Sequence, residues 1–285
     1  MSEKTFITHL QTLTDLVELY DAFLVDQFGV LLNGTGAYEY APETLRRLSD
    51  TGKPVVLLSN SGKRSAENIQ RLLSLGFSRS SFQTVLTSGE VAHSLLLKRA
   101  LRFPRQETTV LVIGERPDAL LDGLPFRVAD TVDDVQLVLI AGSDPRHPHL
   151  DTYRHLLAPL AERGVDCLCT NPDTTRLTES GISFAPGAVA QLYEQMGGTV
   201  EWIGKPFPMM YEAASEQLGI LDASRVLCIG DSPAHDIAGG QQAGFSTALV
   251  TGGIHAGETL VDIGRHCEQL GILPDHVLQR FAFAA

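Results

Sequence analysis

The stretch AFLVDQFGVLLNG, residues 22–34, places Asp26 directly behind an apolar run that is typical of a buried strand. Near the other end of the chain, VLCIGDSPAHDIAGG, residues 226–240, repeats the arrangement, with Asp231 behind an apolar run. In open parallel sheets, ligands bind at the carboxyl ends of the strands, where backbone groups and helix N-termini converge. We therefore expect Asp26 and Asp231 to lie at the binding edge of one parallel sheet.

The rest of the chain alternates short β-rich runs with helical patterns, which favours a parallel sheet with crossover helices. Polar residues directly after apolar strands occur in roughly the first 85 and the last 85 residues. The pattern predicts an α/β protein with a Rossmann-like parallel-sheet core and an inserted, smaller α/β domain. The expected division is 1–87 for the first part of the core, 88–198 for the inserted domain and 199–285 for the second part of the core.

Composition limits the partners of the protein. Apolar residues make up 44% and charged residues 20% of the 285 residues, which excludes wholesale disorder. The 22 Lys and Arg against 34 Asp and Glu give a net charge of -12. A surface this negative repels phosphate backbones and anionic lipid, so we expect neither nucleic acid nor a membrane as partner. A small anionic substrate would need a locally positive pocket.

No apolar run is long enough to span a membrane, and the opening residues lack the apolar core of a signal peptide, so a cytoplasmic protein is expected. The four cysteines form no Cys-x-x-Cys pair, so the sequence indicates neither a disulfide framework nor a structural zinc site. Cys167 and Cys169 alternate within a strand-like run and are expected to share one buried face.

A second strand end carries groups suited to a phosphate. In VVLLSNSGKRS, residues 55–65, the Ser59 side chain and the backbone N–H groups of Asn60 and Ser61 can surround an anion at a helix N-terminus. In WIGKPFPMMYEAA, residues 202–214, Lys205 can neutralise a phosphoryl group. Taken singly, each signal is weak, since a strand-end polar residue also suits a turn and a lysine suits the surface.

The segment after residue 226 adds a pair of carboxylates. Asp231 and Asp236 flank a loop that enters a helix, and hard oxygen ligands of this kind suit Mg²⁺. Two acids in the first turn of a helix are an equally good interpretation of the pair alone.

The order of these segments is more specific than any one of them. A strand-end Asp, a strand-end Ser-Asn, a Gly-Lys-Pro and a Gly-Asp-x4-Asp follow one another, and the sequence resembles the haloacid dehalogenase (HAD) superfamily in this series. The inserted region, its segment Thr170-Asn171-Pro172-Asp173, and the ending AGFSTALVTGGI are similar to the NagD-like subfamily, whose members carry a large α/β cap of type IIA. The resemblance spans about residues 20–255.

The resemblance implies a Mg²⁺-dependent phosphatase acting on a small organic phosphate, with sugar phosphates among the candidates. Asp26 would attack phosphorus and form an aspartyl-phosphate, while Asp26, Asp231 and the backbone carbonyl of Phe28 would bind the metal. Ser59 and Lys205 would bind phosphoryl oxygens. Asp236 would orient Lys205 or a metal-bound water.

One position departs from the family pattern. Phosphatases of the superfamily carry a second aspartate two residues after the nucleophile, as general acid and base, and here that position is Phe28. A phenyl ring transfers no proton, and general acid–base catalysis contributes roughly 10²- to 10⁴-fold in rate. His235, or Asp173 and Glu179 in the cap, could supply the proton, or the substrate could have a good leaving group.

Two other functions remain open. Dehalogenases of the superfamily also carry an aromatic residue at this position and attack carbon without a metal, although Asp231 and Asp236 would repel their anionic groups. A slow phosphate-binding protein is the second alternative. The cap is expected to choose the substrate, with Asn171 and Asp173 at its rim. Capped enzymes of this size often associate through the cap, so a homodimer is an expected state.

Overall fold

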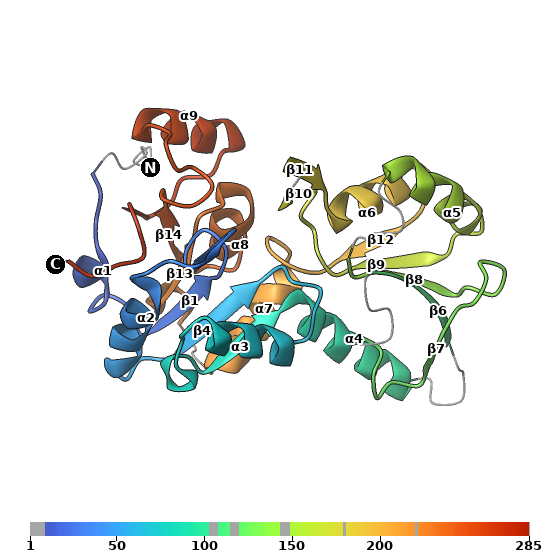
Figure 1. The fold of residues 1–285 in the computed structure, drawn as a ribbon, viewed down its shortest axis with the longest axis horizontal. Coiled ribbons are helices and arrows are strands. Elements are labelled where there is room, and N and C mark those ends of the chain that lie inside the picture. Colours follow the sequence, from blue (N-terminus) through green and yellow to red (C-terminus); the bar gives the residue numbers. More distant parts are fainter. Residues whose placement is uncertain are drawn as a thin grey trace. The chain divides into compact units, whose positions relative to one another are not determined.

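The computed structural model describes residues 9–102, 108–114, 120–142, 149–178, 181–219 and 222–284. The described residues form two compact units, one within the ranges 1–59, 66–86 and 205–285 and one within the ranges 60–65 and 87–204. Figure 1 shows that each unit contains its own β-sheet with helices around it. The division expected from the sequence, with boundaries after 87 and 198, stays a prediction.

The first unit is built on a six-stranded sheet in the order β15-β14-β13-β1-β4-β5, and the pairings from β15 to β4 are parallel. A two-stranded antiparallel hairpin, β2-β3, follows β1 in the chain. The strands are β1 (Ala22–Asp26), β2 (Leu32–Asn33), β3 (Gly36–Ala37), β4 (Val55–Ser59), β5 (Thr84–Thr87), β13 (Val226–Gly230), β14 (Ser246–Val250) and β15 (His276–Leu278).

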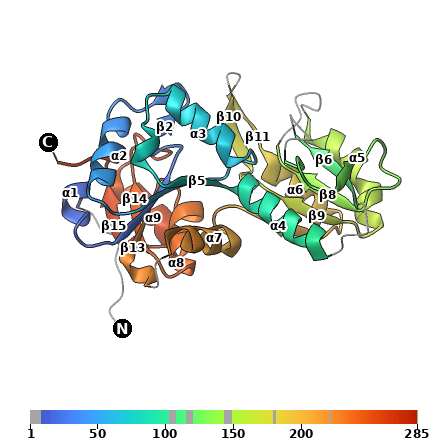
Figure 2. The ribbon, with the colours of Figure 1, turned by 90° about the horizontal axis from the view of Figure 1, so that it is seen from below.

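Helices cover both faces of this sheet. The helical segments are α1 (Leu13–Leu16), α2 (Ala41–Asp50), α3 (Ser65–Ser74), η1 (Arg79–Ser81), α7 (Pro208–Leu218), η2 (Ala223–Arg225), the π-type turn η3 (Pro233–Ile237), α8 (Ala238–Gln242) and α9 (Leu260–Leu270). On one face, Phe23 and Val25 of β1 pack with Leu45 of α2 and Leu72 of α3. On the other, Leu249 packs with residues of η3 and α9, and α7 lies beside α8 (Figure 2).

The second unit has a five-stranded parallel sheet in the order β12-β9-β8-β6-β7, with an antiparallel hairpin, β10-β11. Helices α5 and α6 lie side by side on one face, opposite α4 (Figure 1). Its elements are α4 (Ser88–Arg102), β6 (Thr108–Ile113), β7 (Phe126–Val128), β8 (Leu137–Ile140), α5 (Leu150–Glu162), β9 (Asp166–Cys169), β10 (Thr175–Thr178), β11 (Gly181–Phe184), α6 (Pro186–Gln195) and β12 (Val200–Trp202).

The α/β fold class predicted from the sequence is confirmed, since each unit has a parallel sheet with helices packed against it. Cys167 and Cys169 belong to one buried cluster between β9 and the α5–α6 face, as expected. Burial raises the pKa of the Cys169 thiol to about 12, so this side chain is a core residue rather than a reactive thiol. Among the described residues, no helix is both long enough and apolar enough to cross a membrane. The cytoplasmic location stays a prediction.

Candidate active site

The carboxyl ends of the two central strands place Asp26 and Asp231 next to each other. Strands β1 and β13 pair in parallel with Val25 opposite Ile229, so Asp26 ends its strand beside Gly230, and Asp231 follows. All residues of both strands are buried, which fixes the two strand ends in the core of the unit. Asp26 is 8% exposed and Asp231 is 3% exposed. This edge therefore carries two buried carboxylates.

Lys205 connects Asp26 with a third carboxylate. Its Nζ donates to Oδ1 of Asp26 at 2.5 Å and to Oδ1 of Asp236 at 2.6 Å. Lys205 is 3% exposed and Asp236 is 1% exposed. Since a buried charge is costly unless it is paired, the two ion pairs account for the burial of Lys205.

The cluster contains more negatively charged groups than positively charged ones. Ligand oxygens of Asp26, Asp231 and Asp236 lie within 4.8 Å of one another, against the one ammonium group of Lys205. Burial, with the charges of Asp236 and Asp231, raises the pKa of Asp26 well above its usual range, although Lys205 opposes this. Burial alone would lower the pKa of Lys205, but Asp236 and Asp26 outweigh it and raise that pKa. The cluster provides carboxylate oxygens that can bind a cation preferring hard oxygen ligands.

Three glycines shape the cluster. A Cβ atom on Gly29 would lie 1.7 Å from Oδ2 of Asp231, and one on Gly253 would lie 2.1 Å from the same oxygen. A Cβ atom on Gly230 would lie 2.1 Å from Cγ of Asp236. The backbone thus packs directly against the carboxylates, and the N–H of Ile254 donates to Oδ2 of Asp231 at 2.8 Å. These contacts fix the position of the Asp231 carboxylate.

Phe28 lies beside this cluster with an exposed ring. Phe28 is 47% exposed. In the backbone bridge between Phe28 and Leu32, the N–H of Gly29 donates to the Leu32 carbonyl and the N–H of Leu32 donates to the Gln27 carbonyl. The Phe28 carbonyl takes no part in that bridge. Carboxylate and carbonyl oxygens are the ligands that Mg²⁺ prefers, so this set of donors fits the ion that the sequence implies.

The other predicted binding residues fall into both units. Ser59 ends β4 of the first unit, one residue beyond Leu58, which pairs with Asp26. In the second unit, Nδ2 of Asn60 donates to Oδ1 of Asp173 at 2.9 Å, and the N–H of Asp173 donates to Oδ1 of Asn171 at 2.9 Å. The structure therefore brings Asn60, Asn171 and Asp173 together within that unit.

Ser61 also lies in the second unit, where its carbonyl accepts from the N–H of Gly89 at 3.0 Å. His235 lies in η3, and its carbonyl accepts from the Tyr211 hydroxyl at 2.9 Å. Glu179 lies outside the described residues. The contacts described for His235 and Asp173 do not show whether either residue transfers a proton. The proton-transfer roles of His235, Asp173 and Glu179 therefore stay hypotheses.

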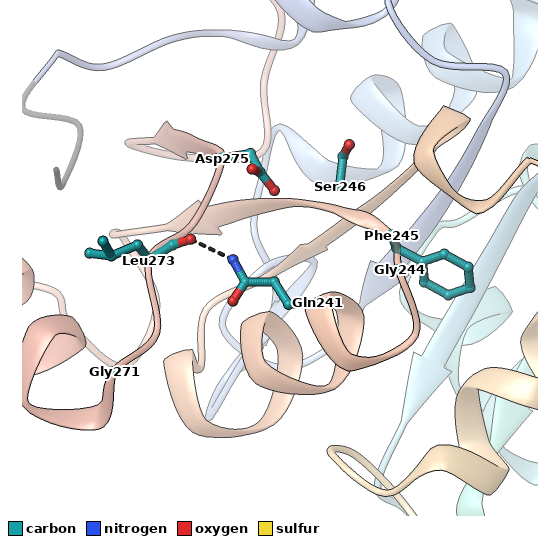
Figure 3. A pocket seen from close by; sticks show the side chains of 7 residues that line it. All are labelled: Gln241, Gly244, Phe245, Ser246, Gly271, Leu273 and Asp275. Atoms are coloured by element: carbon teal, nitrogen blue, oxygen red, sulfur yellow. Dashed lines mark hydrogen bonds between the residues drawn. The ribbon is translucent and has the colours of Figure 1, made fainter. Parts of the chain in front are cut away.

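A hollow of about 450 Å³ lies elsewhere on the first unit (Figure 3). Ser246 begins β14 and Asp275 precedes β15, and both strands run parallel to β13, so the hollow lies at the amino ends of the strands, at the end of the sheet opposite the carboxylate cluster. Gln241 donates to the Leu273 carbonyl across it. The hollow is separate from the candidate site and is lined by Gln241, Gly244, Phe245, Ser246, Gly271, Leu273 and Asp275.

Sequence reasoning missed the packing around Asp231. Neither Gly29, Gly253 nor the Ile254 N–H was identified as part of the site. The signal available was the Gly252-Gly253 pair one residue beyond an apolar strand, at the same kind of strand end as Asp231.

Known proteins are similar to this chain in sequence and in fold. Residues 23–122 match the family described as haloacid dehalogenase-like hydrolase, and residues 202–282 match the HAD-hydrolase-like family. The 5′-nucleotidase YutF of Bacillus subtilis is 30% identical over 86% of this chain and 93% of its own length. Ribonucleotide monophosphatase NagD of Escherichia coli K-12 is 29% identical over 81% of this chain and 87% of its own length.

Solved structures agree with these matches. A haloacid dehalogenase-like hydrolase from Brucella suis 1330 has a TM-score of 0.80 and 28% identity, covering 97% of this chain and 100% of that one. NagD from Escherichia coli K-12 has a TM-score of 0.73 and 25% identity, covering 93% of this chain and 98% of that one. The fold and the site therefore define a hydrolase of the α/β fold class with a parallel sheet and a carboxylate cluster at its strand ends. The chain belongs to the haloacid dehalogenase-like hydrolase family, in its NagD-like branch.

The charge of the cluster predicts how stability depends on pH. Burial and the nearby Asp236 raise the pKa of Asp231 from 3.8 to about 7. A carboxyl group whose pKa is higher in the folded than in the unfolded protein stabilises the fold at low pH and loses that contribution as the pH rises. Without a divalent cation, we expect this group to lower the free energy of unfolding by on the order of 2–4 kcal/mol between about pH 4 and pH 7.

Urea unfolding in the presence of a chelator measures this effect. In Asp231→Asn, the free energy of unfolding should fall less between about pH 4 and pH 7, and the variant should be more stable than the wild type at about pH 8. Asp262→Asn, which changes an exposed carboxylate paired with Arg265, should keep the pH dependence of the wild type. An Asp231→Asn variant with an unchanged pH dependence would show that this carboxyl group is not responsible.

Gly29 allows a separate test of the packing around Asp231. Gly29→Ala should weaken divalent-cation binding at least about tenfold, because the new Cβ would displace the Asp231 carboxylate. Gly257→Ala is the matched control, since Gly257 has a similar positive φ of 93° but nothing within 4 Å of an added Cβ. It should cost about 1 kcal/mol of stability and leave cation affinity unchanged. Equal cation affinity in the two variants, measured by calorimetric titration with Mg²⁺, would contradict the proposed role of this packing.

Proposed function

We propose that this chain is a Mg²⁺-dependent phosphatase that hydrolyses a small organic phosphate through an aspartyl-phosphate on Asp26. The observation that carries the proposal is the buried arrangement in which Lys205 joins Asp26 and Asp236 while Asp231 lies within the same cluster. The family supports phosphoryl chemistry, because relatives named 5′-nucleotidase and ribonucleotide monophosphatase match over most of the chain.

The first step is attack of Asp26 on phosphorus. Lys205 holds Oδ1 of Asp26, so we assign the attack to Oδ2. A bond forms between Oδ2 and phosphorus as the bond from phosphorus to the leaving-group oxygen breaks, and a leaving group that departs as an alkoxide takes up a proton from solvent water. Water then attacks the aspartyl-phosphate, which releases inorganic phosphate and regenerates the Asp26 carboxylate.

The cation would be held by Asp26, Asp231 and the Phe28 carbonyl, and when bound it reduces the repulsion between the carboxylate and the phosphoryl group. Lys205 contributes a fixed positive charge to the phosphoryl oxygens in the transition state. Asp236 holds the Lys205 ammonium at 2.6 Å, so it orients that charge. Ser59, at the end of the neighbouring strand β4, is proposed to bind a further phosphoryl oxygen.

The three carboxylates favour this chemistry over dehalogenation. A dehalogenase that works without a metal has no use for Asp231 and Asp236, and their charges would repel an anionic substrate. The test is release of inorganic phosphate from p-nitrophenyl phosphate with and without Mg²⁺. Release that depends on Mg²⁺ supports the proposal, and halide release from a haloacid without Mg²⁺ would overturn it. The substrate, sugar phosphates included, and the homodimer stay predictions.

A further inference from the structure

An arginine lies on the exposed ring beside the carboxylate cluster. The guanidinium carbon of Arg71, in the last turn of α3, lies 4.8 Å from the centroid of the Phe28 ring. A cation within about 6 Å of an aromatic centroid is attracted by the negative face of the ring. The Phe28 ring therefore fixes a positive charge at this point of the first unit.

Arg71 keeps its hydrogen-bonding capacity for a ligand. Among the described residues, no carboxylate lies within ion-pair distance of its guanidinium, whereas Arg64 pairs with Glu90 and Arg225 pairs with Asp21. The guanidinium carbon of Arg71 lies over the ring, and the N–H donors of a guanidinium point outward in its own plane. A planar fork of donors held in this way suits a carboxylate or phosphate, which accepts two parallel hydrogen bonds.

The stacked pair is close to the proposed nucleophile. Phe28 follows Asp26 by two residues, so their Cα atoms are at most about 7 Å apart. Gly29, the next residue, packs against the Asp231 carboxylate. A separation of this size can be spanned by the organic part of a small phosphate ester bound at Asp26, which places the Phe28 ring and the Arg71 cation among the groups that such a substrate can contact. In a protein with a net charge of -12, a local cation at this position matters for any anionic substrate.

We infer that Arg71, held on the Phe28 ring, binds a second anionic group carried by the organic part of the substrate. The inference rests on the proposed phosphatase function and specifies its substrate class. The preferred substrates are small phosphate monoesters whose leaving group carries a carboxylate or a second phosphate. Arg71 determines specificity and takes no part in proton transfer or in attack on phosphorus.

Two matched substrates test the inference, namely phenyl phosphate and 4-carboxyphenyl phosphate, each with Mg²⁺. The wild type should have the higher kcat/KM for the carboxylated ester, and Arg71→Gln should reduce the ratio of the two kcat/KM values about tenfold, mainly through KM. Hydrolysis of phenyl phosphate should be unchanged in this variant, which also shows that it folds. Comparing ratios between variants cancels the difference in leaving group between the two esters. High salt should weaken the wild-type preference.

Arg47→Gln is the matched control, because Arg47 stacks on the Phe283 ring at 4.3 Å, in a pair that includes no residue of the proposed site. It should keep the wild-type ratio. An unchanged ratio in Arg71→Gln, or an equal loss on both esters, would overturn the inference while leaving the phosphatase function in place. Failure of the wild type to release phosphate from either ester would instead overturn the proposed function itself.

Discussion

Replacement of Asp26 by Asn is expected to reduce release of inorganic phosphate from p-nitrophenyl phosphate by at least about 10³-fold. The amide is a poor nucleophile and cannot form the aspartyl-phosphate. The loss should appear in kcat, because Lys205 and the remaining carboxylates are still present to bind the phosphoryl group and the cation. Steady-state kinetics with Mg²⁺ measure it.

Asp275→Asn is a suitable control for the loss of a partly buried carboxylate contact in the same unit. The Asp275 carboxylate accepts from the N–H and hydroxyl of Thr247 at the other edge of the sheet, where it supports β14. This variant should lose stability but retain its kcat. Substantial phosphate release by Asp26→Asn would rule out the proposed nucleophile.

The second large effect is a gain of activity. Phe28→Asp should raise kcat/KM for an alkyl phosphate by up to about 10²-fold, because it supplies the missing proton donor. The effect on kcat/KM for p-nitrophenyl phosphate should be small, since its leaving group departs without protonation. The wild type should accordingly hydrolyse aryl phosphates much faster than alkyl phosphates, and Phe28→Asp should narrow this difference.

Phe28→Asn separates proton transfer from the loss of the ring, because it has the shape of the aspartate without its acidity. Only Phe28→Asp should gain activity toward the alkyl ester, and the gain should depend on pH. If both variants behave alike, proton transfer is not what limits the wild type, and another group already provides it.

The main features of the fold could be predicted because they depend on local patterns. The apolar runs before Asp26 and Asp231 predict strands, and the parallel-sheet argument puts their ends at one edge, although about 200 residues of chain separate them. Short strands were harder to predict. β15, with three residues, has too few positions to show a period and is stabilised by its neighbour in the sheet.

The candidate site was only partly predictable. The resemblance to a family implied the role of Lys205, which a lone lysine in a sequence would not. The stacking of Arg71 on Phe28 and the packing of Gly253 against Asp231 depend on tertiary contacts between segments far apart in the chain. No local pattern of residues reports such contacts, so the structure was needed to find them.

The most direct test of the central claim is a search for a phosphoryl group on Asp26. The wild type is mixed with p-nitrophenyl phosphate and Mg²⁺, quenched in acid, digested and examined by mass spectrometry. Because Phe28 cannot activate the water that hydrolyses the intermediate, the aspartyl-phosphate should accumulate on the peptide that contains Asp26 and be absent without Mg²⁺. Phosphate release without any such phosphopeptide, or with the phosphoryl group on another residue, would contradict the account.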